Sequence, residues 1–202
     1  MQLLGSPASP FVRKVRVLLA ETGHEDEVQM VGVVAAAIGP VDEALLAANP
    51  LGKLPTLLRE DGPAIYDSRV ICRYLDEKFG LDAYPTHSKY EMLTLEATAD
   101  AIMDAGVAMV YERRLRPAEI VFEDYIEGQW RKIDRALDAV EARWMSHLSG
   151  PVDMSHIAMG CALGYLDFRH ADRDWRTGRP TLAAWAEGFA DRPSMVETAP
   201  EG

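Results

Sequence analysis

Ser9 stands where a hydroxyl could meet an anion, because it lies directly before a helix signal that begins at Pro10. A helix start presents unpaired N–H groups and a partial positive charge, which stabilise an anion such as a thiolate. Proline suits the first helical position because its φ is already helical and its missing N–H would have no partner there. Ser9 is therefore open to two interpretations, an ordinary N-cap and a hydroxyl that also serves a ligand.

A second candidate stretch runs from Asn49 to Leu57 and places Pro55 at the entry of a strand. A cis Leu54–Pro55 bond costs only about 0.5–1 kcal/mol relative to trans, and it would turn the N–H and C=O of Leu54 toward a ligand. Extended ligands are held by such backbone pairs. An ordinary trans proline at a strand edge is the competing interpretation.

The third candidate is Asp67-Ser68, an acidic and hydroxyl pair at another helix start. Exposed N–H groups there would accept a carboxylate, while the Asp67 side chain could pair with an ammonium group. A free amino-acid terminus carries both groups. Plain helix capping explains the same pair without a ligand.

Alternating strand and helix signals surround these residues in the first part of the chain. They are strand over 1–5, helix over 10–22, strand over 27–33, helix over 41–48 and strand over 54–59. The turn Asp61-Gly62-Pro63 then predicts an antiparallel hairpin with a short strand over 64–66. Asp67-Ser68 opens a helix that Gly80 ends. This alternation predicts an α/β domain.

Long helical periods replace the strand signals after an irregular segment that contains Pro85. We therefore expect an α/β domain over 1–80, a linker over 81–87 and an all-helical domain over 88–202. One apolar stripe predicts a single helix of about 25 residues. Its members are Ile126, Trp130, Ile133, Leu137, Val140, Trp144 and Leu148. Asp153 is expected to cap the next helix, which is apolar nearly all round and should lie inside its domain.

Composition limits the classes of partner. The chain has 202 residues, 48% hydrophobic and 26% charged, with a formal net charge of −11. A strongly negative chain without a basic stripe argues against nucleic-acid and anionic-membrane partners. Its longest apolar runs fall short of the roughly 18 residues that a membrane span needs. Its first residues lack a signal-peptide pattern, so we expect a cytoplasmic protein.

Cysteine and histidine usage favours neither a disulfide framework nor a metal site. Cys72 and Cys161 lie in apolar helix-like stretches, which suits small buried side chains in a reducing compartment. The five histidines, His24, His87, His147, His156 and His170, lack close partners at ligand spacing. We therefore expect no metal.

The order of the three candidate stretches resembles the glutathione S-transferase family, and the resemblance covers essentially the whole chain. The matches are Ser9-Pro10-Phe11, Asn49-Pro50-Leu51-Gly52-Lys53-Leu54-Pro55 and Asp67-Ser68. The resemblance implies a thioredoxin-like N-terminal domain that binds glutathione and an all-α C-terminal domain that completes the pocket for an electrophile. It also implies a homodimer.

By position, the resemblance implies that Ser9 lies beside the glutathione sulfur. A thiol loses about one pKa unit for each 1.4 kcal/mol of preferential thiolate stabilisation, which a hydroxyl donor and a helix start together could supply. Ser6 also lies between the first strand and the helix, and it competes for this role. Because position 9 is not cysteine and Val12 removes any Cys-x-x-Cys pair, thiol addition or displacement is expected rather than disulfide exchange.

The same resemblance assigns the rest of the tripeptide. Leu54, before the family's cis-proline at Pro55, would pair its backbone with the cysteinyl part of glutathione. Asp67 and Ser68 would hold the γ-glutamyl end, and Lys53 is a candidate for the glycyl carboxylate.

Three further sets of residues carry expectations of their own. Arg13, Lys14 and Arg16 are expected on a solvated helix face, with an effect on the field around an anionic tripeptide as the alternative. The family's inner helix usually begins with Ser or Thr followed three residues later by Asp, and here Asp153 and His156 hold those places. The second-substrate pocket is expected to use one helix face. Its residues are Asp100, Ala101, Met103, Asp104, Val107 and Tyr111.

Two functions from different classes follow from these observations. The first is a glutathione transferase of the detoxifying kind, in which Ser9 activates bound glutathione for attack on a small hydrophobic electrophile. The alternative is a glutathione-binding or protein-partner-binding module with little transferase activity, since a fold alone does not confer function.

Overall fold

The computed structural model describes all residues from Met1 to Gly202. Its contacts define two compact units. The first unit consists of Met1–Tyr84 together with Pro193–Gly202, and the second unit of Pro85–Arg192. The segment 81–87, expected to be a linker, therefore divides between the two units, and Pro193–Gly202 groups with the first unit rather than with the helices that precede it.

A small mixed sheet forms the centre of the first unit. Its strands are β1 (Gln2–Gly5), β2 (Gln29–Gly32) and β3 (Thr56–Leu58), in the order β2-β1-β3. β1 runs parallel to β2 and antiparallel to β3. The expected hairpin partner of β3 is present only as a single antiparallel bridge between Leu57 and Ile65.

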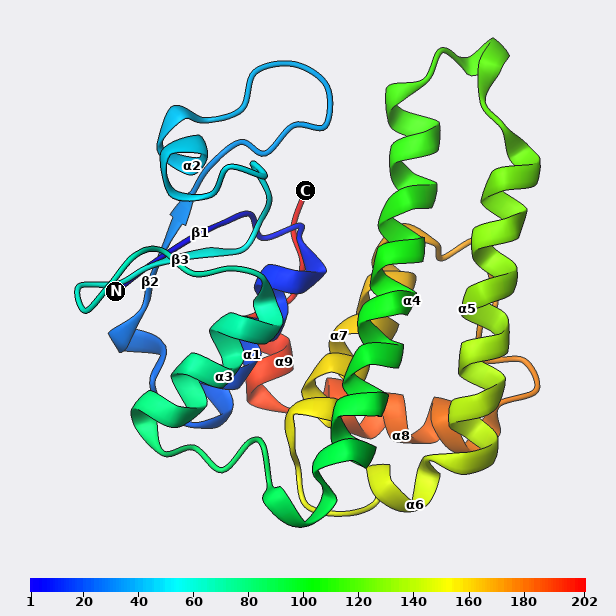
Figure 1. The fold of residues 1–202 in the computed structure, drawn as a ribbon. Coiled ribbons are helices and arrows are strands. Elements are labelled where there is room, and N and C mark those ends of the chain that lie inside the picture. The colour runs from blue at the N-terminus through cyan, green and yellow to red at the C-terminus, as the bar shows by residue number, and fades with distance from the viewer. The chain divides into compact units, whose positions relative to one another are not determined.

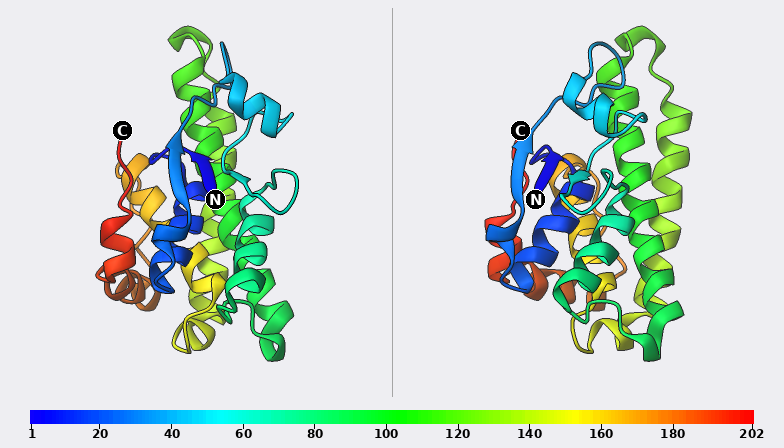
Figure 2. Two further views of the ribbon diagram at one scale, coloured as in Figure 1. Left: turned by 90° about the vertical axis from the view of Figure 1, so that its left-hand side faces the viewer. Right: turned by 60° about the vertical axis from the view of Figure 1, so that its left-hand side comes forward.

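Helices accompany this sheet in the first unit. They are α1 (Pro10–Glu21), α2 (Glu43–Ala48), α3 (Ser68–Phe79), α9 (Pro193–Glu197) and the 3-10 turn Glu25–Glu27. Apolar residues from the sheet and from α1 and α3, including Leu3, Val15 and Ile71, are fully or almost fully buried. Figures 1 and 2 show α1 in blue beside α9 in red, and the two helices are in contact.

The second unit is entirely helical. Its helices are α4 (Lys89–Leu115), α5 (Glu123–Arg143), α6 (Met145–Leu148), α7 (Met154–Arg169) and α8 (Pro180–Ala190), with 3-10 turns at Thr86–Ser88 and Ala118–Ile120. α4 packs on both α5 and α7. α7 is buried along most of its length, as the nearly continuous apolar sequence predicts.

The apolar stripe from Ile126 to Leu148 does not form one helix, so that prediction is wrong. α5 ends at Arg143, and Trp144 is the residue between α5 and α6. The stripe still faces the core on both sides of the break, because Val140 and Leu148 are both buried.

The expected fold class is confirmed: a small sheet with helices is followed by an all-helical part. Measured by length and hydropathy together, none of the helices reaches what a membrane crossing requires.

Candidate functional site

The register of the sheet gathers the candidate residues at one end of it. β1 and β3 pair Leu4 with Thr56 at the end of their register, so the segment after β1, which carries Ser6, and the segment before β3, which carries Leu54, leave the sheet at the same end. Ile65, which forms a single antiparallel bridge with Leu57, lies two residues before Asp67, so the chain runs from this bridge toward the same end of the sheet. α1 and α3 both begin at this end, which therefore has the positive ends of two helices.

Ser9 is the N-cap of α1, as the sequence predicts. Its backbone is extended, with φ −82° and ψ 121°, and its Oγ accepts a hydrogen bond of 3.3 Å from the N–H of Val12. The side chain is half-buried, and its hydroxyl hydrogen has no acceptor within the protein. Ser9 can therefore cap the helix and donate to a ligand at the same time.

Ser6 lies in the turn that leads to this cap. Its carbonyl accepts a 3.0 Å hydrogen bond from the N–H of Ser9, while its own hydroxyl, also half-buried, is not part of the helix cap. Both serines are therefore accessible, but only Ser9 combines a free hydroxyl hydrogen with the start of a helix.

The Leu54–Pro55 peptide bond is cis, so the cis alternative is confirmed. Neither the N–H nor the C=O of Leu54 has a hydrogen-bond partner in the protein, although Leu54 is half-buried. A half-buried backbone donor and acceptor side by side form a ready site for an extended ligand, because such groups are normally paired.

A buried network around Asn49 holds this loop, and it went unrecognised in the sequence. Asn49 Nδ2 donates to the Lys53 carbonyl at 3.1 Å and to Thr56 Oγ1 at 3.0 Å, while its Oδ1 accepts from the Leu51 N–H at 3.0 Å. Thr56 Oγ1 donates to the same Lys53 carbonyl at 3.0 Å. Gly52 adopts a φ of +59°, which suits glycine in this tight turn. An asparagine before a proline-containing turn was the available signal.

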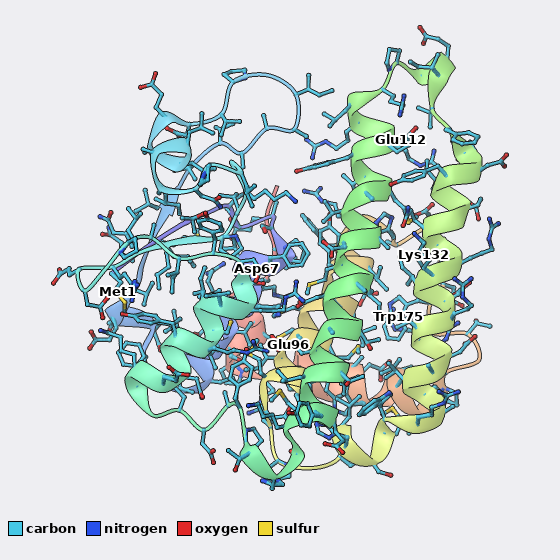
Figure 3. All side chains as sticks on the ribbon, in the orientation of Figure 1. Met1, Asp67, Glu96, Glu112, Lys132 and Trp175 are labelled. Atoms are coloured by element: carbon cyan, nitrogen blue, oxygen red, sulfur yellow. The ribbon has the colours of Figure 1, made fainter.

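Asp67 and Ser68 open α3 as expected. Asp67 Oδ1 accepts a 3.0 Å bond from the N–H of Arg69, and Oδ2 accepts a 3.2 Å bond from the Arg69 guanidinium. Asp67 is exposed and Ser68 is buried. Figure 3 shows Asp67 at the first turn of α3. The Asp67 carboxylate is therefore held in place and exposed to a cationic ligand. Such a ligand would compete with the Arg69 guanidinium for this carboxylate.

Lys53 is exposed, and its ammonium group makes no ion pair in the structure. The expectation of a solvated face for the cations of α1 is wrong for two of them. Arg13 is 6% exposed and Lys14 is fully buried. Burial and the neighbouring Arg13 lower the pKa of Arg16, and Glu201 opposes that shift.

The cap of α7 is a second cluster of titratable groups. Asp153 Oδ1 accepts from the N–H and the hydroxyl of Ser155 at 2.9 and 2.6 Å and lies 2.8 Å from His156 Nδ1, while Oδ2 lies 2.9 Å from His147 Nε2. Burial raises the pKa of Asp153, but the hydrogen bonds from His156 and Ser155 outweigh it and lower the pKa to about 2. Asp153 Oδ1 also accepts from the N–H of His156 at 3.4 Å, so Asp153 caps this helix where the family usually has a hydroxyl, and His156 holds the place of the family's carboxylate.

This cluster is also where a metal ion could be held, because ligand atoms of His147, Asp153 and His156 lie within 4.8 Å of one another. The expectation that these histidines lack close partners is therefore wrong. Both oxygens of Asp153 already accept hydrogen bonds, and an ionised carboxylate 2.8 Å away favours a proton on His156 Nδ1. The arrangement is accounted for by helix capping.

The residues expected in the second-substrate pocket lie on α4 but do not share one exposed face. Asp100 and Met103 are buried, Val107 is half-buried, and Ala101, Asp104 and Tyr111 are exposed. Nearby in the same unit, the His170 ring nitrogen Nε2 lies 3.0 Å from the Gly106 carbonyl, and burial lowers the pKa of His170.

Comparison with known proteins gives a consistent assignment. The family model described as "Glutathione S-transferase, N-terminal domain" matches residues 3–83, and "Glutathione S-transferase, C-terminal domain" matches residues 123–188. The chain is 36% identical over 205 residues to the uncharacterized GST-like protein YibF of Escherichia coli K12, covering 99% of this chain and 98% of that protein.

Solved structures agree. A glutathione transferase family member from Pseudomonas fluorescens Pf-5, with bound glutathione, has a TM-score of 0.95 at 45% identity, and the match covers 100% of this chain and 99% of that one. A glutathione S-transferase from Methylobacillus flagellatus KT, with glutathione bound, has a TM-score of 0.85 at 37% identity over 99% of both chains. Because both family models and full-length relatives match a chain with this fold, the protein belongs to the glutathione S-transferase family.

Proposed function

We propose that this protein is a glutathione transferase in which Ser9 stabilises the thiolate of bound glutathione for attack on a small hydrophobic electrophile. The observation that carries the proposal is the convergence of three features at one end of the sheet. They are the free hydroxyl hydrogen of Ser9, the unpartnered backbone of Leu54 and the start of α3 at Asp67 and Ser68. Relatives crystallised with glutathione support the identity of the ligand.

The thiolate is the species that reacts, and Ser9 favours it. A free thiol has a pKa of about 8.5 and is mostly protonated at neutral pH. A hydrogen bond from the Ser9 hydroxyl to a charged sulfur contributes roughly 1.5–3 kcal/mol, and the positive end of α1 adds a smaller amount. Together they lower the pKa of the bound thiol by one to two units, at about 1.4 kcal/mol each.

The rest of the site holds the tripeptide. The N–H and C=O of Leu54 pair with the backbone of its cysteinyl residue. The Asp67 carboxylate accepts from its γ-glutamyl ammonium, while the Ser68 N–H and hydroxyl donate to the neighbouring carboxylate. Lys53, which has no ion pair of its own, reaches the glycyl carboxylate.

The chemistry is addition or displacement at carbon. The thiolate forms a C–S bond, and either the electrophile's leaving group departs with its electron pair or a proton from water completes an addition. Disulfide exchange is disfavoured, because neither Ser9 nor Val12 is a cysteine. We propose that the protein acts as a cytoplasmic homodimer, for which sedimentation velocity provides the test.

A calorimetric titration with glutathione, followed by a panel of electrophiles, tests the function. Binding followed by turnover of at least one electrophile supports the transferase. Binding without turnover on any of them favours the alternative, a glutathione-binding module, and the absence of binding contradicts both.

Replacing the Ser9 hydroxyl tests its role directly. In Ser9→Ala we expect kcat to fall by roughly tenfold or more with little change in the dissociation constant for glutathione, because the lost bond acts on the thiolate. Steady-state kinetics and calorimetry measure the two quantities. Ser6→Ala is the matched control and should retain wild-type turnover. A fully active Ser9→Ala, or a larger loss in Ser6→Ala, excludes Ser9 as the sulfur partner.

A further inference from the structure

The segment Pro193–Gly202, which we call the C-terminal segment, packs along α1. Near the last residue of α1, the Ser194 hydroxyl donates to the Glu21 carboxylate. Nearer the start of α1, Arg13 Nη2 donates to the Met195 carbonyl at 2.9 Å. Ser194 and Met195 are both buried. The segment is therefore fixed to α1 at two points through the buried residues Ser194 and Met195.

Two arginines of α1 extend this attachment toward the first turn of the helix. Arg13 Nε lies 3.5 Å from Thr198 Oγ1, and Arg16 donates to the Glu197 carbonyl at 3.4 Å. Thr198 itself is buried and donates to the Ser194 carbonyl at 2.6 Å. The charge of Glu201 opposes the lowering of the Arg16 pKa. These arginines therefore anchor the segment and do not form a solvated face.

The segment continues until it meets the turn that carries Ser9. A Cβ built on Gly202 would lie 3.7 Å from the Cβ of Ala8, the residue directly before Ser9. Figures 1 and 2 show the end of the chain, marked C, beside the turn that joins β1 to α1 in every view. Within that turn the one backbone hydrogen bond is the Ser9 N–H to the Ser6 carbonyl, so few backbone hydrogen bonds hold the turn itself.

We propose that Ala199–Gly202, anchored through Arg13 and Arg16, braces the Ser6–Ser9 turn and so keeps the Ser9 hydroxyl aimed at the bound sulfur. Arg13 and Arg16 are then positioning residues, because they act on the reaction only through the segment. A hydrogen bond weakens steeply when its donor moves or turns, so a small shift of the turn is enough to reduce thiolate stabilisation. This inference rests on the proposed role of Ser9.

A chain that ends at Thr198 tests the proposal, because it keeps the buried contacts of Ser194, Met195 and Thr198. We expect kcat to fall by up to about tenfold, the effect of a sub-ångström misplacement. We also expect the pH–rate profile to move to higher pH and the ultraviolet thiolate absorbance of the glutathione complex to decrease. Glu197→Ala, which changes an exposed side chain of the same segment, should leave all three quantities at their wild-type values.

Arg16→Gln in the full chain provides a second variant in case the shortened chain fails to fold. It keeps every contact of Arg13 and should move the pH–rate profile in the same direction by a smaller amount. If either folded variant keeps the wild-type profile and absorbance, the bracing role is excluded.

Combining the shortened chain with Ser9→Ala separates this inference from the proposed function. If the segment acts through Ser9, shortening the chain has no further effect in Ser9→Ala. An equal loss of kcat in both backgrounds overturns the bracing role and leaves the role of Ser9 intact. A fully active Ser9→Ala overturns both.

Discussion

Ser9 and Asp153 are both helix N-caps, but their surroundings give them different uses. Ser9 is half-buried, accepts one hydrogen bond and keeps a hydroxyl hydrogen without an acceptor. Asp153 is buried, and its two oxygens accept bonds from Ser155, His156 and His147. A cap with an unused donor can serve a ligand, whereas a cap whose acceptors are all occupied stabilises its helix.

The Asp153 carboxylate gives stability a distinct pH dependence. Its folded pKa of about 2 lies below the unfolded value of 3.8, so its contribution is complete above pH 4 and is lost as pH falls toward 2. At pH 7 we expect Asp153→Asn to lower the free energy of unfolding by roughly 2 kcal/mol. Urea unfolding between pH 7 and pH 2.5 measures the difference between the two proteins, which should shrink only below about pH 4.

The exposed Glu187→Gln is the matched control for Asp153→Asn, because its carboxylate makes no hydrogen bond. It should differ from the wild type by a few tenths of a kcal/mol at most. A gap between wild type and Asp153→Asn that persists unchanged at the lowest pH would show that charge is not the basis of the cap.

Asn49 links the packing of the loop before β3 to the proposed binding of glutathione. Asn49→Ala removes one of the two donors to the Lys53 carbonyl and leaves the Leu51 N–H without its side-chain acceptor, so we expect roughly 2 kcal/mol of lost stability. Because this loop presents Leu54, the KM for glutathione should rise several-fold while kcat changes less. Thr56→Val, which removes two bonds of the same network but keeps the bonds from Asn49 to Leu51 and Lys53, should act in the same direction and more weakly.

Kinetics with varied glutathione, together with urea unfolding, measure these effects. A KM that stays at the wild-type value in a folded but destabilised Asn49→Ala would mean that the network supports the fold without positioning Leu54.

Element boundaries were predictable where local chemistry sets them. α3 begins after Asp67 and ends before Gly80 as expected, because a capping carboxylate and a glycine with φ +66° act within one turn. The break at Trp144 escaped the periodicity, since Val140, Trp144 and Leu148 keep a spacing of four on both sides of it. The strand expected over 64–66 is reduced to the bridge at Ile65 because nothing in a short sequence fixes how many pairs will form.

Contacts between distant parts of the chain lay beyond the reach of the sequence. The three motifs of the site could be recognised because each is short and local. By contrast, Arg13 is buried by a partner 185 residues away, and no spacing rule indicates such a pair. The contact between His147 and Asp153 is local, since the two positions are six residues apart, and was missed because α6 and the turn after it bring the two side chains together.

The division into two compact units predicts in which segments glutathione binding should slow amide hydrogen exchange. The first unit contains all the candidate binding residues and also the C-terminal segment, which lies on α1. A ligand that binds only the native state stabilises it by about 2.7 kcal/mol at a concentration 100-fold above its dissociation constant. Amide hydrogen exchange should therefore slow in the Ser6–Ser9 turn, the 49–56 loop, the start of α3 and the residues of α9.

Helices α5 and α8 provide the internal control, because both belong to the second unit and neither carries a residue assigned to the tripeptide. Their backbone amides should exchange at nearly the same rate with and without glutathione, because local opening of one part of a structure need not depend on the stability of another part. The Ser9→Ala protein, which should still bind glutathione, should give the same pattern despite its lower kcat. Protection that spreads evenly over both units would contradict a site confined to these residues. Unchanged exchange in α9 would show that glutathione binding does not affect the C-terminal segment.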